Sequence, residues 1–296
     1  MPVAVIGAGT MGNGIAHVFA LAGHQVFLTD NDHRALEKAV ITIQKNLQRQ
    51  VEKGTITADQ ADLTHSRIVR STAIREWTHP CELVIEAATE NPTTKLAIFR
   101  ELDVATPADT ILATNTSSIS ITRIAAATRD PGRVIGMHFM NPVPVMKLVE
   151  VIRGYSTRKE VVQKVMTWSL ELGKTPVEVN DYPGFISNRI LMPMINEAIQ
   201  ALYEGVAGVQ EIDTVMKLGM AHPMGPLQLA DLIGLDVCLA ILRVLQDGFG
   251  QPKYAPCPLL VNMVQAGRIG VKSKSGFYNY DHGTKELVVA DRFLKN

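Results

Sequence analysis

The chain has 296 residues, which is enough for two domains with a large buried core. Hydrophobic residues make up 46% of it and charged residues 20%, a balance typical of globular proteins rather than disordered ones. Lys plus Arg and Asp plus Glu both total 29, and no basic run occurs. The sequence therefore gives no electrostatic reason to expect nucleic acid or an anionic membrane as a partner.

The three cysteines are widely spaced, at Cys81, Cys238 and Cys257. This pattern predicts neither a disulfide framework nor a metal site and fits a reducing compartment. A first strand beginning at Pro2 leaves no room for a targeting peptide, and no apolar run approaches the roughly 20 residues of a membrane span. We expect a cytoplasmic enzyme, although a mitochondrial enzyme in its mature form would also fit.

The first predicted element is the apolar strand 2–6, which leads into the turn Gly7-Ala8-Gly9-Thr10-Met11-Gly12 and then a helix. In such a turn, Gly7 permits the tight bend, Gly9 leaves room for a pyrophosphate, and Gly12 lets the helix approach the strand. The N-terminal N–H groups and dipole of the helix then favour phosphate binding.

A second apolar run, 25–29, ends at Asp30, roughly 20 residues beyond the turn, where dinucleotide-binding folds carry an acidic residue. A carboxylate at this position binds the adenosine ribose hydroxyls and repels a 2′-phosphate. We therefore predict NAD as the cofactor rather than NADP. The alternative is an ordinary strand–turn–helix unit with an aspartate on its surface.

A long amphipathic helix is predicted over 33–53, with a stripe of basic side chains at four-residue steps, Lys45, Arg49 and Lys53. This stripe is either a solvated face or a contact for an anionic group on a large substrate. A short helix is expected within 54–64.

Strands then alternate with helices, the pattern of a doubly wound sheet. One of these strands runs into Asn115-Thr116-Ser117-Ser118, four small polar residues that serve either as turn and cap residues or in a ligand site. The predicted strands are 67–70, 82–86, 110–114, 134–137, 147–152 and 175–179. One predicted helix starts at Pro92 and continues through 95–102, and another spans 159–172.

His138 lies at the end of a predicted strand, on the side of the sheet where the glycine turn would hold phosphates. Oxidation of an alcohol needs a base for its proton, and histidine suits that role near neutral pH. Glu150 lies on the next predicted strand, where its carboxylate could orient the imidazole. A structural histidine would show the same spacing.

The turn cluster 180–184 separates residues 1–180, a Rossmann-type NAD-binding domain, from residues 181–296, an all-α domain for substrate and dimerisation. The fold class is therefore α/β with a mostly parallel sheet, followed by helices. Predicted helices span 185–203, 209–218, 226–245 and 258–266. Their apolar residues exceed one helical stripe and predict an exposed homodimer interface, represented by Met192, Met194, Ile199, Leu227, Leu229, Leu232, Ile233 and Leu235.

Over nearly its whole length the chain resembles the 3-hydroxyacyl-CoA dehydrogenase family. The segments that carry the resemblance include VIGAGTMGNGIA, ATNTSSISI, GMHFMNPVPVMKLVEVI and DYPGFISNRILMPMINEA. The histidine–proline segment and PGF-x-x-NR are specific to this family among dinucleotide-binding proteins.

The resemblance implies NAD-dependent, reversible oxidation of (S)-3-hydroxyacyl-CoA, here of short chain length, to 3-ketoacyl-CoA in fatty acid metabolism. It implies that His138 is the catalytic base, Glu150 its partner, and Ser117 and Asn188 substrate contacts. It also implies dimers that pair through the helical domain. Positions that match cofactor-binding residues are Gly7, Gly9, Thr10, Met11, Gly12, Asp30, Glu90, Lys95, Ser117, Asn141 and Lys272, and Lys53 matches a contact to the coenzyme A phosphate.

Two positions depart from the family pattern. Lys274 stands where the family has glycine before the final Gly-Phe-Tyr, which bears on the role of Lys272, and Asn46 stands where some relatives carry a serine that contacts coenzyme A. Three other functions fit parts of the sequence: a dehydrogenase of a free hydroxy acid such as gulonate, a non-catalytic, crystallin-like NAD-binding protein, and a plain NAD-binding regulator.

Overall fold

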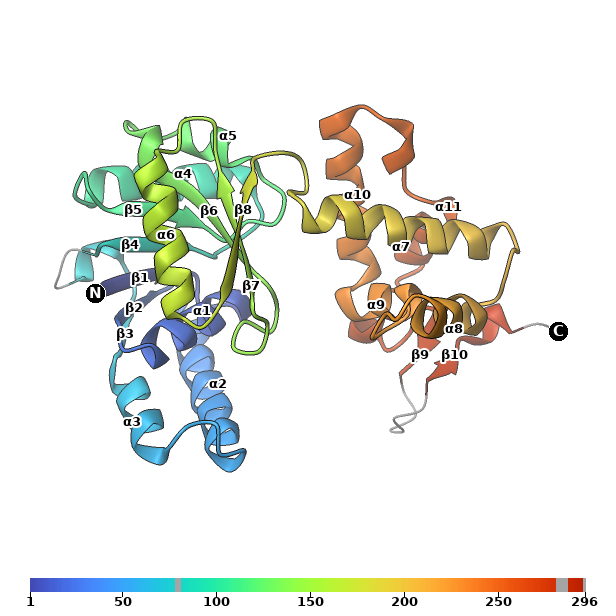
Figure 1. Ribbon diagram of the computed structural model, residues 1–296, viewed down its shortest axis with the longest axis horizontal. Coiled ribbons are helices and arrows are strands. Elements are labelled where there is room, and N and C mark those ends of the chain that lie inside the picture. The colour runs from blue at the N-terminus through green and yellow to red at the C-terminus, as the bar shows by residue number, and fades with distance from the viewer. Residues whose placement is uncertain (78–80, 281–286, 295–296) are drawn as a thin grey trace. The chain divides into compact units, whose positions relative to one another are not determined.

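The computed structural model describes residues 1–77, 81–280 and 287–294, and Figure 1 shows its helices and strands. The chain divides into two compact units, Met1–Tyr182 and Pro183–Asn296. The division falls within the turn cluster 180–184, two residues beyond the predicted boundary, because the last strand of the first unit continues to Asn180.

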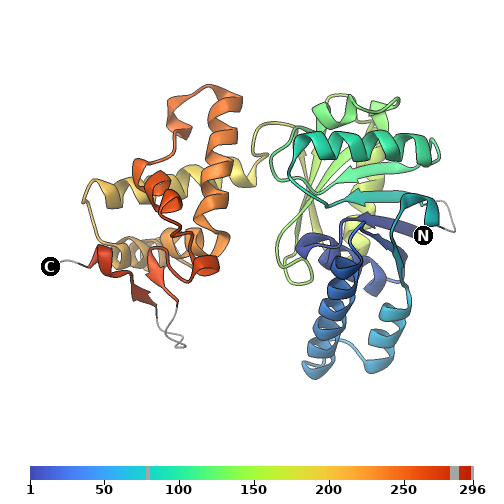
Figure 2. The same ribbon diagram turned by 180° about the vertical axis from the view of Figure 1, so that it is seen from behind.

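An eight-stranded sheet with helices on both faces forms the first unit, as the two opposite views in Figures 1 and 2 show. The strand order is β3-β2-β1-β4-β5-β6-β7-β8, and all neighbours are parallel except β6 and β7. The order reverses between β1 and β4, where such sheets bind dinucleotides. The strands are β1 (Pro2–Ile6), β2 (Gln25–Thr29), β3 (Ile68–Ser71), β4 (Leu83–Glu86), β5 (Ile111–Thr114), β6 (Val134–Phe139), β7 (Leu148–Arg153) and β8 (Thr175–Asn180).

One core cluster joins one face of the sheet to three helices, α1, α2 and α6, through side chains such as Ile15, Leu36, Ile43 and Val165. The opposite face is covered by α4 and α5 (Figure 2). The central strands are buried on both faces, which explains their nearly continuous apolar sequences. The helices are α1 (Thr10–Leu21), α2 (His33–Glu52), α3 (Ala58–Ser66), α4 (Pro92–Ala105), α5 (Ile121–Ala125) and α6 (Lys159–Glu171).

The second unit is helical, with a short antiparallel ribbon of β9 (Tyr278–Asn279) and β10 (Val288–Val289) near its C-terminal end. Its helices are α7 (Ser187–Tyr203), α8 (Val209–Gly219), α9 (Pro226–Ile233), α10 (Leu235–Phe249) and α11 (Pro258–Gln265). The expectation of one helix over 226–245 was wrong. Gly234 has a φ of +102°, outside helical geometry, and it separates α9 from α10.

The expectation of an exposed apolar patch was also partly wrong. Met192, Ile199, Leu227 and Leu235 are buried in the unit's own core, because the break at Gly234 lets α9 and α10 contribute separate faces to it. Of the eight residues predicted to form the interface, only Leu232 is largely exposed, at 56%. Other exposed apolar side chains on α7 and α8 are Ile190, Tyr203, Val215 and Leu218.

Among the described residues, no helix is both long enough and apolar enough to cross a membrane.

Candidate functional site

The glycine turn between β1 and α1 has the close contacts that only glycine permits. A Cβ at Gly12 would lie 1.7 Å from the carbonyl oxygen of Gly7, and one at Gly7 would lie 2.6 Å from the carbonyl oxygen of Ala87. Gly7 also has a φ of +100°. A Cβ at Gly9, by contrast, would meet nothing within 4 Å, so this side of the turn is open. A close-packed turn with one open side at a helix N-terminus fits a pyrophosphate.

Asp30 follows β2 and reaches across to this turn. Its Oδ2 accepts a hydrogen bond of 2.7 Å from the backbone N–H of Ala8, and its Oδ1 accepts one of 3.0 Å from the backbone N–H of Asp32. Asp32 in turn caps α2 by accepting from the backbone N–H of Arg34. The carboxylate is thus held at the carboxyl ends of β1 and β2, where the acid that selects NAD is expected.

A pocket of about 380 Å³ lies beside the glycine turn. Its walls come from the turn, from α2 and from the loop after β6, which includes the predicted site residue Asn141. Asn46 lines the same pocket, so the position that departs from the family pattern faces a cavity rather than the solvent alone. Thr10 and Lys38 also contribute to the wall.

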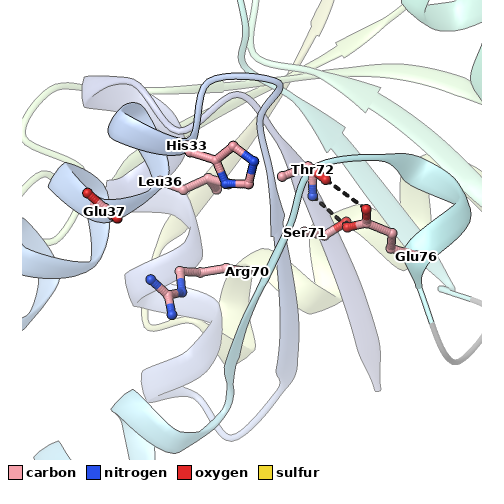
Figure 3. A pocket seen from close by; sticks show the side chains of 7 residues that line it. All are labelled: His33, Leu36, Glu37, Arg70, Ser71, Thr72 and Glu76. Carbon is pink, nitrogen blue, oxygen red and sulfur yellow. Dashed lines mark hydrogen bonds between the residues drawn. The ribbon is translucent and has the colours of Figure 1, made fainter.

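A second pocket, of about 360 Å³, lies between the start of α2 and the end of β3 (Figure 3). The Glu76 carboxylate reaches back to the Thr72 hydroxyl and backbone N–H, each at 2.7 Å, and these hydrogen bonds lower the pKa of Glu76. None of the predicted site residues lines this pocket; its walls are His33, Leu36, Glu37, Arg70, Ser71, Thr72 and Glu76.

His138 and Glu150 are directly opposite each other on the antiparallel strands β6 and β7. The imidazole Nδ1 lies 2.8 Å from Oε2 of Glu150, and both residues are buried. An ionised carboxylate can only accept, so Nδ1 carries the proton and Nε2 is the nitrogen that can act as a base. His138 lies at the end of a strand, as expected, although β6 continues to Phe139, two residues beyond the predicted end.

Ser117, Glu90 and Lys95, three further predicted residues, are brought together at the carboxyl ends of β4 and β5. Oε1 of Glu90 accepts hydrogen bonds from the backbone N–H and the hydroxyl of Ser117, at 2.6 and 2.7 Å. Oε2 of Glu90 accepts from the Thr116 hydroxyl at 2.8 Å and lies 3.7 Å from Nζ of Lys95. Glu90 therefore fixes the position of Ser117.

Sequence reasoning missed Glu86, which is buried at the end of β4. Its Oε2 accepts from Nζ of Lys95 at 2.6 Å and from the Thr114 hydroxyl at 2.8 Å, and its Oε1 accepts from the backbone N–H of Ala88 at 2.8 Å. A carboxylate closing an otherwise apolar strand was the available signal, because a buried charge needs a partner.

Three predicted site residues remain. Lys53 lies at the end of α2 in the first unit, and Asn188 and Lys272 belong to the second unit. Lys53 is exposed and follows the last residue of α2. Asn188 is buried in the first turn of α7. Lys272 forms an ion pair with Asp236 at 3.0 Å. Lys274 has a φ of +60°, so this lysine adopts the left-handed conformation that the family's glycine would adopt more easily.

Together, the reversal of strand order, the tightly packed glycine turn and the acid after β2 define an NAD-binding domain of the Rossmann type. The profile of the 3-hydroxyacyl-CoA dehydrogenase NAD binding domain matches residues 2–182, and that of the C-terminal domain of the same enzymes matches residues 184–280. The chain belongs to the 3-hydroxyacyl-CoA dehydrogenase family.

Similar proteins of known name cover almost the whole chain. A "Probable 3-hydroxybutyryl-CoA dehydrogenase" of Bacillus subtilis is 54% identical over 95% of this chain and 98% of its own. A 3-hydroxybutyryl-CoA dehydrogenase of Bradyrhizobium diazoefficiens is 52% identical over 94% of both chains. The crystal structure of an (S)-3-hydroxybutyryl-CoA dehydrogenase from Ralstonia eutropha superposes with a TM-score of 0.92 at 47% identity, covering 95% of this chain and 99% of that one.

Proposed function

We propose that this protein oxidises short-chain (S)-3-hydroxyacyl-CoA thioesters reversibly, with NAD as the hydride acceptor. The observation that carries the proposal is the His138–Glu150 pair, a buried imidazole held by a buried carboxylate on the sheet that also carries the glycine turn. The names of the relatives support 3-hydroxybutyryl-CoA as the substrate.

In the proposed reaction, Nε2 of His138 removes the proton of the 3-hydroxyl group. Nδ1–H donates to Glu150 throughout, so the carboxylate holds the tautomer and stabilises the imidazolium that forms. NAD, when bound, supplies the acceptor for the hydride from C3. Ser117 and Asn188 would orient the substrate, and holding the reactants in line is a large part of the expected rate enhancement.

Most of the residues proposed to hold NAD belong to the first unit. The glycine turn with Thr10 and Met11 would bind the pyrophosphate, and Asp30 the adenosine ribose. Near the nicotinamide we propose Glu90, Lys95, Ser117 and Asn141, and the family resemblance adds Lys272 to the cofactor-binding residues.

The acyl-CoA is proposed to follow α2. Asn46 lines the pocket beside the glycine turn, and the basic stripe of Lys45, Arg49 and Lys53 continues along the same helix. Over 20 residues α2 extends about 30 Å, which is long enough to follow the pantetheine arm of an extended cofactor-linked substrate. Lys53, at its end, would meet a phosphate of coenzyme A.

The test measures the rate of NADH oxidation with 3-ketoacyl-CoA substrates of increasing chain length. Each thioester is compared with the corresponding free 3-keto acid. We expect turnover of the thioesters, fastest for the four-carbon acyl group, and little turnover of free acids. Equal rates with and without coenzyme A would favour a dehydrogenase of free hydroxy acids such as gulonate. NADH binding without any turnover would favour a crystallin-like binding protein.

A homodimer formed through residues 181–296 is the proposed assembly. Its support is the set of exposed apolar side chains on α7, α8 and α9. Light scattering at low micromolar concentration should give twice the monomer mass, and Leu218→Glu, which places a charge on α8, should reduce it toward the monomer. A monomeric mass for the unaltered chain would contradict the assembly. A cytoplasmic location stays a prediction.

A further inference from the structure

Two carboxylates and one ammonium group meet at the carboxyl end of β4. Nζ of Lys95 lies 2.6 Å from Oε2 of Glu86 and 3.7 Å from Oε2 of Glu90. The Lys95 side chain is 2% exposed and that of Glu86 is fully buried, whereas that of Glu90 is 46% exposed. With all three groups ionised, this cluster has one negative charge in excess.

Glu86 holds this cluster in place. Besides Lys95 it binds the backbone N–H of Ala88 at 2.8 Å, which fixes the segment that follows β4 and carries Glu90. The same segment contacts the glycine turn, because a Cβ at Gly7 would lie 2.6 Å from Cα of Ala88. A change at Glu86 therefore reaches both the turn and the Glu90–Ser117 contact.

The charge of the cluster lies at the end of the sheet where a nicotinamide ring would bind. β4 adjoins β1 at the reversal of strand order, and β4 and β5 begin the half of the sheet that takes the nicotinamide mononucleotide. The nicotinamide ring is cationic in NAD⁺ and neutral in NADH. A negative charge near this end of the site therefore attracts the oxidised cofactor and leaves the reduced one almost unaffected.

We propose that Glu86 is a positioning residue that holds Lys95 and the Glu90 segment and, by keeping the cluster at one excess negative charge, favours binding of NAD⁺ relative to NADH. The proposal rests on the proposed function, because it assumes a nicotinamide cofactor at this end of the sheet. It adds a role for a residue that contacts neither cofactor nor substrate but acts through Lys95 and Glu90.

The first variant is Glu86→Gln, which keeps the shape of the side chain and removes its charge. The cluster then becomes neutral. Dissociation constants measured by NADH fluorescence, with NAD⁺ in competition, should show NAD⁺ binding weakened about three- to tenfold and NADH binding changed less than about twofold. Equal weakening of both forms would mean a purely structural residue and would overturn the proposal.

The second variant, Glu86→Gln with Lys95→Met, removes both members of the pair and restores one excess negative charge through Glu90. Neutral replacement of a whole buried ion pair is often tolerated. Because Lys95 is itself proposed to line the cofactor site, both dissociation constants should rise, but their ratio should return to within about twofold of that of the unaltered protein. A ratio that stays at the value for Glu86→Gln would exclude the charge argument.

The matched control is Asp103→Asn, at the other end of the same helix α4, where Asp103 forms a buried ion pair with Arg133 at 2.9 Å. It should lower the unfolding temperature without changing the ratio. A changed ratio in this control would contradict the proposal. These binding measurements do not depend on turnover, so inactivity toward acyl-CoA thioesters would count against the proposed function alone.

Discussion

The two units hold their buried carboxylates in different ways. In the first unit, Glu86, Asp103 and Glu150 each face a basic side chain, at distances of 2.6 to 2.9 Å. In the second unit, Asp213 and Asp231 accept hydrogen bonds from backbone N–H groups and tyrosine hydroxyls. Within the described parts of the chain, neither of these two aspartates forms an ion pair within 4 Å.

This difference changes what the buried acids can do. A carboxylate beside a cation stays ionised and can orient that cation or support its charge. Asp231 has no such partner: burial raises its pKa to about 6, and the nearby Asp213 adds to the effect. The first unit therefore has fixed charges near its proposed site, whereas the second has a buried acid that can take up a proton.

The largest effect is expected at the one pair whose base can exchange a proton with substrate. His138→Gln should lower kcat by roughly 10²–10⁴, the usual contribution of a general base, with little change in NADH affinity. The control is His24→Gln, just before the amino end of β2, which should keep kcat within about twofold. If His138→Gln loses NADH binding together with turnover, the histidine is structural.

The next effect concerns the ion pair that we place outside the site. Burial alone would raise the pKa of Asp103, but hydrogen bonds from Arg129 and Arg133 outweigh it and hold that pKa below its usual value. Its stabilisation is present at neutral pH and disappears as the pH falls through the lowered pKa. Asp103→Asn should reduce the free energy of unfolding by about 3–5 kcal/mol at pH 7, measured by urea titration. A decrease in the free energy of unfolding of less than about 1 kcal/mol would show that this ion pair does not stabilise the first unit as proposed.

Asp231 should give the opposite dependence on pH. Because its folded-state pKa is raised, its stabilisation is complete below the unfolded pKa near 3.9 and is lost as the pH rises through about 6. The unaltered protein should therefore exceed Asp231→Asn in stability by roughly 1–2 kcal/mol more at pH 4.5 than at pH 7.5, in urea titrations followed by circular dichroism. Asp247→Asn, at an exposed position of α10, is the control. An equal difference at both pH values would show that Asp231 stays ionised.

The smallest effect is expected at one of the hydroxyls that hold Asp231. Tyr280 donates to Oδ2 of Asp231 at 3.1 Å, while the backbone N–H groups of Phe277 and Tyr278 continue to bind the carboxylate without it. Tyr280→Phe should reduce the free energy of unfolding by about 0.5–1.5 kcal/mol, and more at pH 7.5 than at pH 5, because the ionised form loses a donor. The exposed Tyr203→Phe is its control. A larger loss at the lower pH would contradict a role as donor to an ionised acid.

Most of the first unit could be predicted because its signals are local. The glycine turn, Asp30 and the apolar strands depend on neighbours in the sequence, and the structure has the expected strands and helices with small shifts at their ends. The pattern alone pointed to Asp30, His138 and Glu150, whereas Glu90, Lys95 and Asn141 were reached through the family resemblance. The roles of all these residues stay predictions. Glu86 was missed because its partners, Lys95 and Thr114, are defined by the packing of a helix and a neighbouring strand rather than by spacing.

The core and the helix boundaries of the second unit were harder to predict from the sequence, for a physical reason. Apolar residues at helical spacing show that a helix has an apolar face but not what packs against that face. Met192, Ile199, Leu227 and Leu235 were therefore assigned to an exposed surface, although they lie in the core. The break at Gly234 could not be read from one glycine, because an isolated glycine is tolerated inside helices. The buried pair Asp213 and Asp231 gave no signal either, since its donors come from the distant segment 277–280.

The alignment of His138 with Glu150 has a consequence for how the family can vary. Because the two residues face each other in strand register, the connection between β6 and β7 can change in length or composition without separating them. A single deletion inside β7 would instead put Val149 or Val151 opposite the histidine and turn Glu150 to the other face of the sheet. Insertions or deletions within the two strands should therefore be selected against because of the pair itself, whereas the connecting loop is constrained only by the pocket that it lines.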